Sequence, residues 1–421
     1  MHHLATLYYS GKGTEKNLEE AFYWYQKAAE NGDKGAMHDL AIYYENSEGT
    51  EKNLKKAFYW YQKATENGND NAMHCLARCY ENGIGTEKNL EKAFYWHQKA
   101  AENGDKDAMN CLAVCYEISK GIAKNLKKAF YWYQKAAEYG NNNAILNLAN
   151  CYKSGKGIEQ NLEMAFYWYQ RATENGNNNA MHCLARCYEN GIGTEKNLEK
   201  AFYWHQKAAE NGDKDAMNCL AVCYEISKGI AKNLKKAFYW YQKAAEYGNN
   251  NAILNLANCY EIGKGIEKNL EMAFYWYQRA TENGNNNAMH YLAECYKDGI
   301  GTKKNLEKAF YWHQKAAENE DISAMLCLAK SYYIGEGTER NMEKTFYWFH
   351  KAAENGNNNA MEHLATFYKI GEGTEKNLEK AFYWYQKAEE NGNDNAMHYL
   401  AECYKDGIGT EKNLEKAFYW Y

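Results

Sequence analysis

Cysteine and histidine are the residues of this chain whose chemistry could support metal binding or catalysis, and both recur at regular spacings. Two residues four apart lie on one face of an α-helix, where two thiolates could bind one metal ion, although zinc sites usually use Cys-x-x-Cys at a turn. By helical projection these cysteines flank an apolar stripe, so we interpret them as small core residues and expect neither a metal site nor a cofactor. The pairs are Cys75/Cys79, Cys111/Cys115, Cys183/Cys187 and Cys219/Cys223.

The twelve histidines are scattered, and no catalytic constellation emerges from their order. His74 and His97 fall on different predicted helices, and no serine or cysteine with a positioned acid completes a triad. The Gly83-x-Gly85 motif is not followed by the Gly-Lys-Ser/Thr of a phosphate loop, and helix termination explains it. We therefore predict no catalytic residue and a protein that is not an enzyme.

The elements that position these residues are set by an internal repeat. Each tryptophan lies 36 residues from the next without interruption, so no linker divides the chain. A longer duplication overlies this period, because residues 71–152 recur identically as 179–260. The tryptophans are Trp24, Trp60, Trp96, Trp132, Trp168, Trp204, Trp240, Trp276, Trp312, Trp348, Trp384 and Trp420.

One repeat, residues 72–107, illustrates the predicted local structure. Ala72, Leu76 and Tyr80 share one face of a first helix, which ends at the glycines near residue 83. Asn89 is the expected N-cap of a second helix. That helix has an apolar stripe of Leu90, Ala93, Phe94, His97, Ala100 and Ala101, and we expect Phe94 and Trp96 to contribute its large buried areas.

Neither helix can bury its apolar face alone, so neighbouring repeats must stack. The sequence predicts an all-α fold, a right-handed α/α superhelical solenoid of about twelve 36-residue helix–turn–helix repeats, with residues 1–421 as one array. The repeats step at Ala36, Ala72, Ala108, Ala144, Ala180, Ala216, Ala252, Ala288, Ala324, Ala360 and Ala396.

Composition excludes several classes of protein. The net charge is −5, from 50 basic and 55 acidic residues that alternate without a basic stripe, so we do not expect nucleic-acid binding. No apolar stretch is long enough for a transmembrane helix, and the N-terminus lacks a signal peptide. We therefore expect a cytoplasmic protein whose 13 cysteines are reduced.

The repeat resembles the Sel-1-like repeat (SLR), a relative of the tetratricopeptide repeat. The resemblance implies an adaptor or scaffold that binds other proteins or peptides, and in some eukaryotes such arrays lie beside a protein-kinase domain. The sequence departs from the family pattern at Ala77, where a glycine is usual, at Ser47, Ser119 and Ser227 in the loop, and at His97, His205 and His313, where a tyrosine is usual. The matching residues are Ala72, Leu76, Tyr80, Gly83-Ile84-Gly85, Asn89, Lys92-Ala93, Trp96, Lys99-Ala100-Ala101 and Gly104.

Comparison of the repeats with one another suggests a recognition surface. The second helix is nearly invariant, whereas the first helix varies at two outward or flanking positions, four residues apart. We expect both positions to line a concave face that reads a partner, the alternative being relaxed selection on an exposed face. They are His38, Ile42, His74, Arg78, Asn110, Val114, Leu146, Asn150, His182, Arg186, Asn218, Val222, His290, Glu294, Leu326, Lys330, Glu362, Thr366, His398 and Glu402.

Two further expectations concern the tyrosines before each tryptophan and the chain ends. A row of tyrosines such as Tyr23, Tyr59 and Tyr95 could stack on a ligand, but packing onto the next repeat is the favoured interpretation. The chain begins inside a first helix and stops part-way through a second one. We therefore expect both ends to be incomplete. Two explanations are open: the protein associates end to end with itself, or the chain is part of a larger signalling protein such as a kinase.

Overall fold

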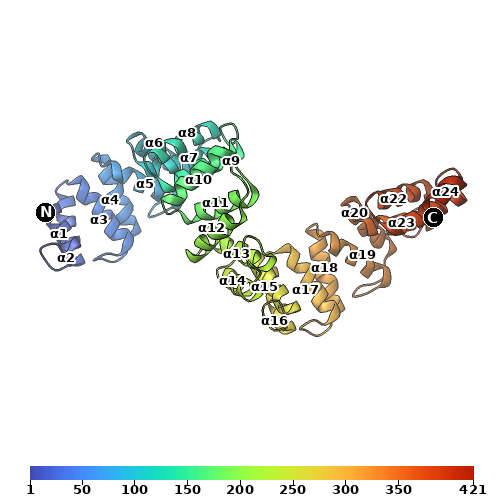
Figure 1. Ribbon diagram of the computed structural model, residues 1–421. Coiled ribbons are helices and arrows are strands. Elements are labelled where there is room, and N and C mark those ends of the chain that lie inside the picture. The colour runs from blue at the N-terminus through green and yellow to red at the C-terminus, as the bar shows by residue number, and fades with distance from the viewer. The chain divides into compact units, whose positions relative to one another are not determined.

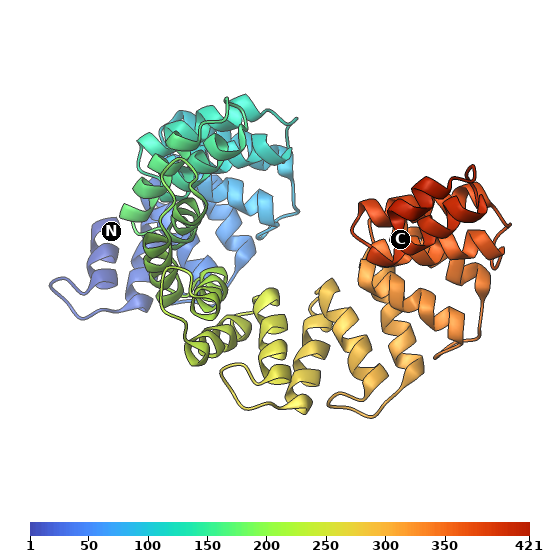
Figure 2. The ribbon, with the colours of Figure 1, turned by 45° about the vertical axis from the view of Figure 1, so that its right-hand side comes forward.

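The computed structural model covers residues 1–421 and contains 24 α-helices and no strand. It divides into two compact units, residues 1–213 and 214–421, and each unit is a stack of six helix pairs (Figures 1 and 2). Within a unit, each second helix packs on its own first helix and on the first helix of the following pair. The predicted all-helical repeat architecture is therefore confirmed.

The helices alternate between first and second members of a pair. In the first unit they are α1 (His2–Ser10), α2 (Leu18–Glu30), α3 (Lys34–Asn46), α4 (Leu54–Glu66), α5 (Asp70–Asn82), α6 (Leu90–Glu102), α7 (Lys106–Ile118), α8 (Leu126–Glu138), α9 (Asn142–Ser154), α10 (Leu162–Glu174), α11 (Asn178–Asn190) and α12 (Leu198–Glu210). In the second unit they are α13 (Lys214–Ile226), α14 (Leu234–Glu246), α15 (Asn250–Ile262), α16 (Leu270–Glu282), α17 (Asn286–Asp298), α18 (Leu306–Glu318), α19 (Ile322–Ile334), α20 (Met342–Glu354), α21 (Asn358–Ile370), α22 (Leu378–Glu390), α23 (Asp394–Asp406) and α24 (Leu414–Trp420).

The predicted helix ends are confirmed in the repeat formed by α5 and α6. The Asn89 side chain accepts a 2.9 Å hydrogen bond from the Lys92 amide, as an N-cap does. Gly83 ends α5 in the left-handed conformation, with φ of 73°. Ser119 holds the corresponding place after α7 with φ of 61°, although a serine there is strained relative to glycine.

The core follows the predicted stripes, with one difference in the second helix. Ala72 and Leu76 of α5 are buried, as are Ala93 and His97 of α6. The expectation that Phe94 and Trp96 supply the large buried areas is wrong, because both are only partly buried against the core. The large buried ring lies at the position after the tryptophan, 100° further round the helix. In α6 this residue is His97, and in α4 it is Tyr61, which is 1% exposed.

From the second repeat of each unit onward, a close backbone contact joins each loop to the preceding repeat. At Gly85, a Cβ atom would lie 1.9 Å from the carbonyl oxygen of Leu54 in α4, far inside van der Waals contact. Gly104, which also has positive φ, has no atom within 4 Å of the corresponding position. Both glycines need the left-handed conformation, but only Gly85 needs the absence of a side chain.

We predict that Gly85→Ala destabilises the repeat far more than Gly104→Ala. Left-handed backbone costs either variant about 1–2 kcal/mol, and overpacking adds about 1–3 kcal/mol at Gly85 alone. Amide hydrogen exchange of α4 to α6 measures the difference, because local opening free energies report on each repeat. Equal loss of protection in the two variants would contradict the backbone contact.

Candidate functional site

The residues predicted to recognise a partner lie along the first helices, at two positions four residues apart. The first position, occupied by His74, Asn110 and Leu146, is half-buried. At the second position Arg78 and Asn150 are exposed. In the second unit Lys330 is likewise exposed and Leu326 half-buried. The two positions overlap in how much surface they present, because His398 at the first position is exposed and several residues at the second position are half-buried. These half-buried residues are Ile42, Val114, Val222, Glu294, Thr366 and Glu402.

Residues at the half-buried position make contacts within the stack. Asn147 donates a 3.1 Å hydrogen bond from its side-chain amide to Asn110 Oδ1, and Leu146 packs against the core of the first unit. The rings of His74 and His97 lie 5.3 Å apart between centroids. These side chains connect neighbouring helices as well as bordering the surface.

Residues at the second position pair with the buried tyrosine of their own helix pair, or with the preceding repeat. Tyr169 donates a 2.6 Å hydrogen bond to Asn150 Oδ1. Arg78 Nη2 lies 3.6 Å from Glu45 Oε1 of the preceding first helix. Arg78 and Asn150 remain exposed beyond these contacts, whereas Ile42, Val114 and Val222 at the same position are apolar and half-buried, so this position varies in polarity from repeat to repeat.

Sequence reasoning missed a third position on the same face, at the last residue of the first helix. In α7 it is Ile118, four residues after Val114 and 61% exposed. The spacing of four from the predicted residues was the signal that could have found it. The second unit has four such isoleucines, each at least 55% exposed: Ile226, Ile262, Ile334 and Ile370. We call the three positions together the first-helix stripe.

The tyrosine row on the second helices is a surface feature. Tyr59 and Tyr95 are each 50% exposed, so the expectation that they pack into the next repeat is wrong. Each ring instead contacts the adjacent tryptophan edge-on, as Tyr95 does with Trp96 at 5.0 Å between centroids. The Lys99 ammonium lies over the Tyr95 ring, so the row has an aromatic and cationic surface.

The cysteines are free thiols, and the two members of each pair differ in burial. Cys79 and Cys115 are buried, and burial raises the pKa of Cys79 to about 12 and that of Cys115 to about 11. These thiols stay protonated near neutral pH and behave as small core residues, as predicted. Cys75 and Cys111 are half-buried instead, and each lies beside a histidine of the preceding repeat.

A chain of polar contacts near the N-terminus corrects the expectation that no cysteine has a positioned histidine and acid. Cys75 Sγ lies 3.9 Å from His38 Nε2, and His38 Nδ1 lies 3.1 Å from Asp39 Oδ1. Asp39 also accepts a 3.0 Å contact from His2. The cysteine sits inside α5, where backbone N–H groups bond to helical carbonyls, so no free N–H beside the sulfur could stabilise an oxyanion.

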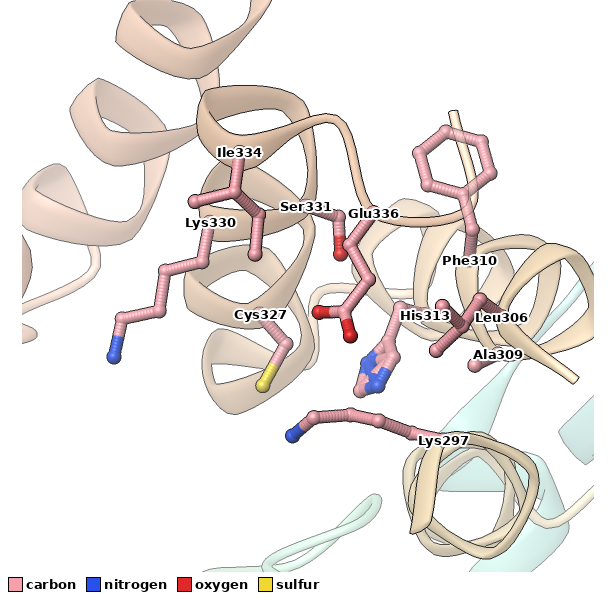
Figure 3. Close-up of a pocket in the computed structure, with 10 residues that line it drawn as sticks. All are labelled: Lys297, Leu306, Ala309, Phe310, His313, Cys327, Lys330, Ser331, Ile334 and Glu336. Atoms are coloured by element: carbon pink, nitrogen blue, oxygen red, sulfur yellow. The ribbon is translucent and has the colours of Figure 1, made fainter. Parts of the chain in front are cut away.

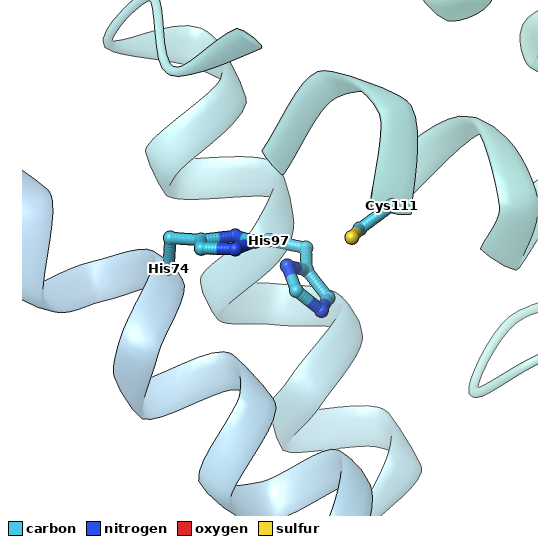
Figure 4. A group of neighbouring side chains, drawn as sticks. All are labelled: His74, His97 and Cys111. Atoms are coloured by element: carbon cyan, nitrogen blue, oxygen red, sulfur yellow. The ribbon is translucent and has the colours of Figure 1, made fainter. Parts of the chain in front are cut away.

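Two groups of histidine and cysteine, one in each unit, could hold a metal ion. His74, His97 and Cys111 meet where α5, α6 and α7 pack (Figure 4), and His290, His313 and Cys327 meet among α17, α18 and α19. Figure 3 shows a cavity of about 140 Å³ beside the second group, into which Lys297 also extends. Sequence reasoning placed the histidines on different helices but did not foresee that they would meet.

A chain built only from antiparallel helix pairs that stack in register is an α/α helical-repeat protein. A family model described as the Sel1 repeat matches almost every residue, so this chain belongs to the Sel1 repeat family. The matched residues are 1–33, 35–69, 71–105, 106–141, 142–177, 179–213, 214–249, 250–285, 286–321, 322–357, 358–393 and 394–421.

Solved structures agree with this membership. The chain is 31% identical to a protective antigen of uropathogenic Escherichia coli that displays an SLR fold, with a TM-score of 0.73 over 95% of this chain and 85% of the antigen. It is 26% identical to a Sel1 repeat protein from Oxalobacter formigenes, with a TM-score of 0.61 over 73% of this chain and 90% of that protein. No curated protein matches the sequence.

Membership of the family carries a general function. Sel1-repeat proteins are helical arrays that generally act as protein-interaction scaffolds and are typically non-catalytic. None of the helices combines the length and the hydropathy needed to cross a bilayer.

The contact between His38 and Asp39 predicts a pH-dependent contribution to stability. Burial lowers the pKa of His38, but hydrogen bonds to Asp39 and Cys75 outweigh it and raise the pKa to about 9. A raised folded-state pKa stabilises the protein below the unfolded value near 6.5, and that contribution is lost as the pH rises through 9.

We therefore predict that His38→Asn, which introduces the residue that Asn110 supplies in another repeat, lowers stability by about 1–3 kcal/mol at pH 6. The deficit relative to the unmodified chain should shrink by pH 10. Thermal melts across this range measure it, with the exposed residue His3 changed to asparagine as control. A deficit that does not vary with pH would contradict the assignment.

Proposed function

We propose that this protein is a non-catalytic scaffold that binds another protein or peptide through the first-helix stripe. The observation that carries the proposal is the row of exposed isoleucines at the ends of first helices, which includes Ile262 and Ile334 at 62% exposure. A large aliphatic side chain gains about 1.5–3 kcal/mol when a partner covers it, and apolar patches on a surface mark interaction sites.

The neighbouring positions supply specificity for such a partner. Leu326 and Lys330 precede Ile334 on α19, whereas Glu362 and Thr366 precede Ile370 on α21. The first helices therefore combine a variable middle with an end that is an isoleucine in some repeats, as at Ile334 and Ile370, and polar in others, as at Asn82. Variation at these positions changes which groups a partner must offer, whereas the isoleucines supply affinity for any extended apolar segment.

The partner that fits this surface is an extended or helical segment with apolar side chains at intervals and mixed charges between them. Because the stripe runs across successive first helices, a long partner can contact several repeats at once. A Sel1-repeat array that acts as the regulatory part of a kinase was the alternative drawn from the family resemblance, and no observation made of this chain favours it.

The proposal predicts that four substitutions on the second unit weaken partner binding at least about tenfold, because each lost aliphatic contact is worth more than 1 kcal/mol. The variant changes Ile226, Ile262, Ile334 and Ile370 to asparagine, which other repeats already carry at this position as Asn82 and Asn190. Quantitative cross-linking and affinity capture from cells that express the protein measure the bound fraction.

A matched control removes exposed isoleucines from outside the stripe. Ile230→Thr and Ile266→Thr change loop residues that are 37% and 38% exposed, and other repeats carry a threonine there. Circular dichroism should show both variants folded. If the stripe variant and the loop variant retain the partner equally, the stripe is not the binding surface. If only the loop variant loses the partner, the binding surface lies on the loops.

A further inference from the structure

Three side chains that could bind a metal ion meet at a junction between repeats, and one of them, His74, also belongs to the first-helix stripe. His74 of α5, His97 of α6 and Cys111 of α7 each offer one ligand atom, and these atoms lie within 4.8 Å of one another. Figure 4 shows the three side chains converging from three helices. Because α5 and α6 form one repeat and α7 starts the next, the group spans the boundary between two repeats.

The two ring nitrogens of His97 are in different environments. The ring is fully buried, and Nε2 lies 2.9 Å from Glu81 Oε2. A carboxylate only accepts hydrogen bonds, so Nε2 carries the hydrogen and Nδ1 keeps a lone pair. His97 Nδ1 is buried without a hydrogen-bond partner, and His74 Nδ1 is too. A histidine held by a carboxylate through one nitrogen, with the other free, is the usual state of a metal ligand.

Most other repeats fill this buried position with a tyrosine, and one repeat has Phe349 there. Tyr61 donates a 2.7 Å hydrogen bond to Glu45, and Tyr133 donates a 2.8 Å bond to Glu117. Neither tyrosine leaves an unpaired polar atom. Replacing the tyrosine by histidine therefore creates an unpaired buried nitrogen, which costs stability unless something binds it.

The histidine occurs in the sequence only together with the other two residues. His97, His205 and His313 are the histidines at this position. Each has a histidine 23 residues before it and a cysteine 14 residues after it, at His74 and Cys111, His182 and Cys219, and His290 and Cys327. The third set lies beyond the identical duplication: Cys115 is replaced there by Ser331, whereas the cysteine of the group remains as Cys327.

We propose that His74, His97 and Cys111 form a binding site for a zinc-type divalent cation that ties two consecutive repeats together. Two imidazoles and one thiolate suit Zn²⁺, with a water as the fourth ligand. Tetrahedral ligands at zinc distances lie about 3.3–3.8 Å apart, so side-chain rotations of about 1 Å close the site. On binding, the Cys111 S–H bond breaks, the sulfur bonds to the metal and the proton passes to solvent.

The charges around this group favour a cation. Glu81 holds His97, and Asp105 and Asp107 act electrostatically on both His74 and Cys111. Lys120 is paired with Glu81, and Arg78 is the other cation acting on His74. In the group at His313, Lys297 stands at the position that Glu81 has in the first group. A different carboxylate, that of Glu294, has its Oε1 atom 3.0 Å from His313 Nε2. We therefore expect the first group to bind metal more tightly than the group at His313.

The test uses the full chain stripped of metal by a chelator and titrated with Co²⁺, which reports thiolate ligation by a charge-transfer band. His205→Tyr and His313→Tyr together leave one intact group, and this double variant should bind one equivalent of Co²⁺ with the thiolate band. Excess Zn²⁺ should displace the Co²⁺ and raise the melting temperature. Adding His97→Tyr, which restores the residue common to other repeats, should abolish all three effects.

Two cysteine variants in the same double-variant background separate the site from unspecific thiol binding. Cys111→Asn introduces the residue found at Asn147 and should abolish the band, whereas Cys115→Ser introduces the residue found at Ser331 and should keep it. Metal-free melts show that each variant folds, and His97→Tyr should melt no lower than its parent. Absence of the thiolate band in the double variant, or its persistence after His97→Tyr, would overturn the proposal, which does not depend on the scaffold function.

Discussion

The structure depends on a contact between two stretches of backbone. From the second repeat of each unit onward, the second glycine of the loop lies so close to the first turn of the preceding second helix that a Cβ atom would fall 1.9 to 2.2 Å from a carbonyl oxygen, as at Gly49 against Leu18 and Gly157 against Leu126. Because backbone atoms are common to all residues, this contact sets the same step between repeats whatever side chains surround it. The aromatic pair of Phe94 and Tyr116 then packs across the same boundary.

A fixed step divides the side chains into those that maintain the stack and those that can change. The second helix carries the caps, the alanines and the buried tyrosine or histidine, so it tolerates little variation. The first helix contributes Ala72 and Leu76 to the core, whereas the residues of the first-helix stripe are only partly covered by the array. Variation concentrates on the stripe because substitutions there leave the backbone contact between repeats intact, and this is the property a binding scaffold needs.

Local patterns predicted most of this fold, and the failures arose where a residue's environment depends on a neighbouring helix. Asn89, Gly83 and the stripe around Leu76 act through residues close in sequence, so propensity and spacing were sufficient. Trp96 was assigned to the core because tryptophan is large, but its position on the helix directs it to the margin. The meeting of His74, His97 and Cys111 requires the packing angles of three helices, which spacing within one helix does not reveal.

The shared junction has a genetic consequence. Since neighbouring repeats within each unit meet through the same backbone contact, in-frame gain or loss of whole repeats by unequal recombination joins ends that already fit. The identical segments at 71–152 and 179–260 are the product of such an event, with a shift of three repeats. The combination of histidines and cysteine recurs with that same shift, so alleles that differ in length by this segment would also differ by one copy of it.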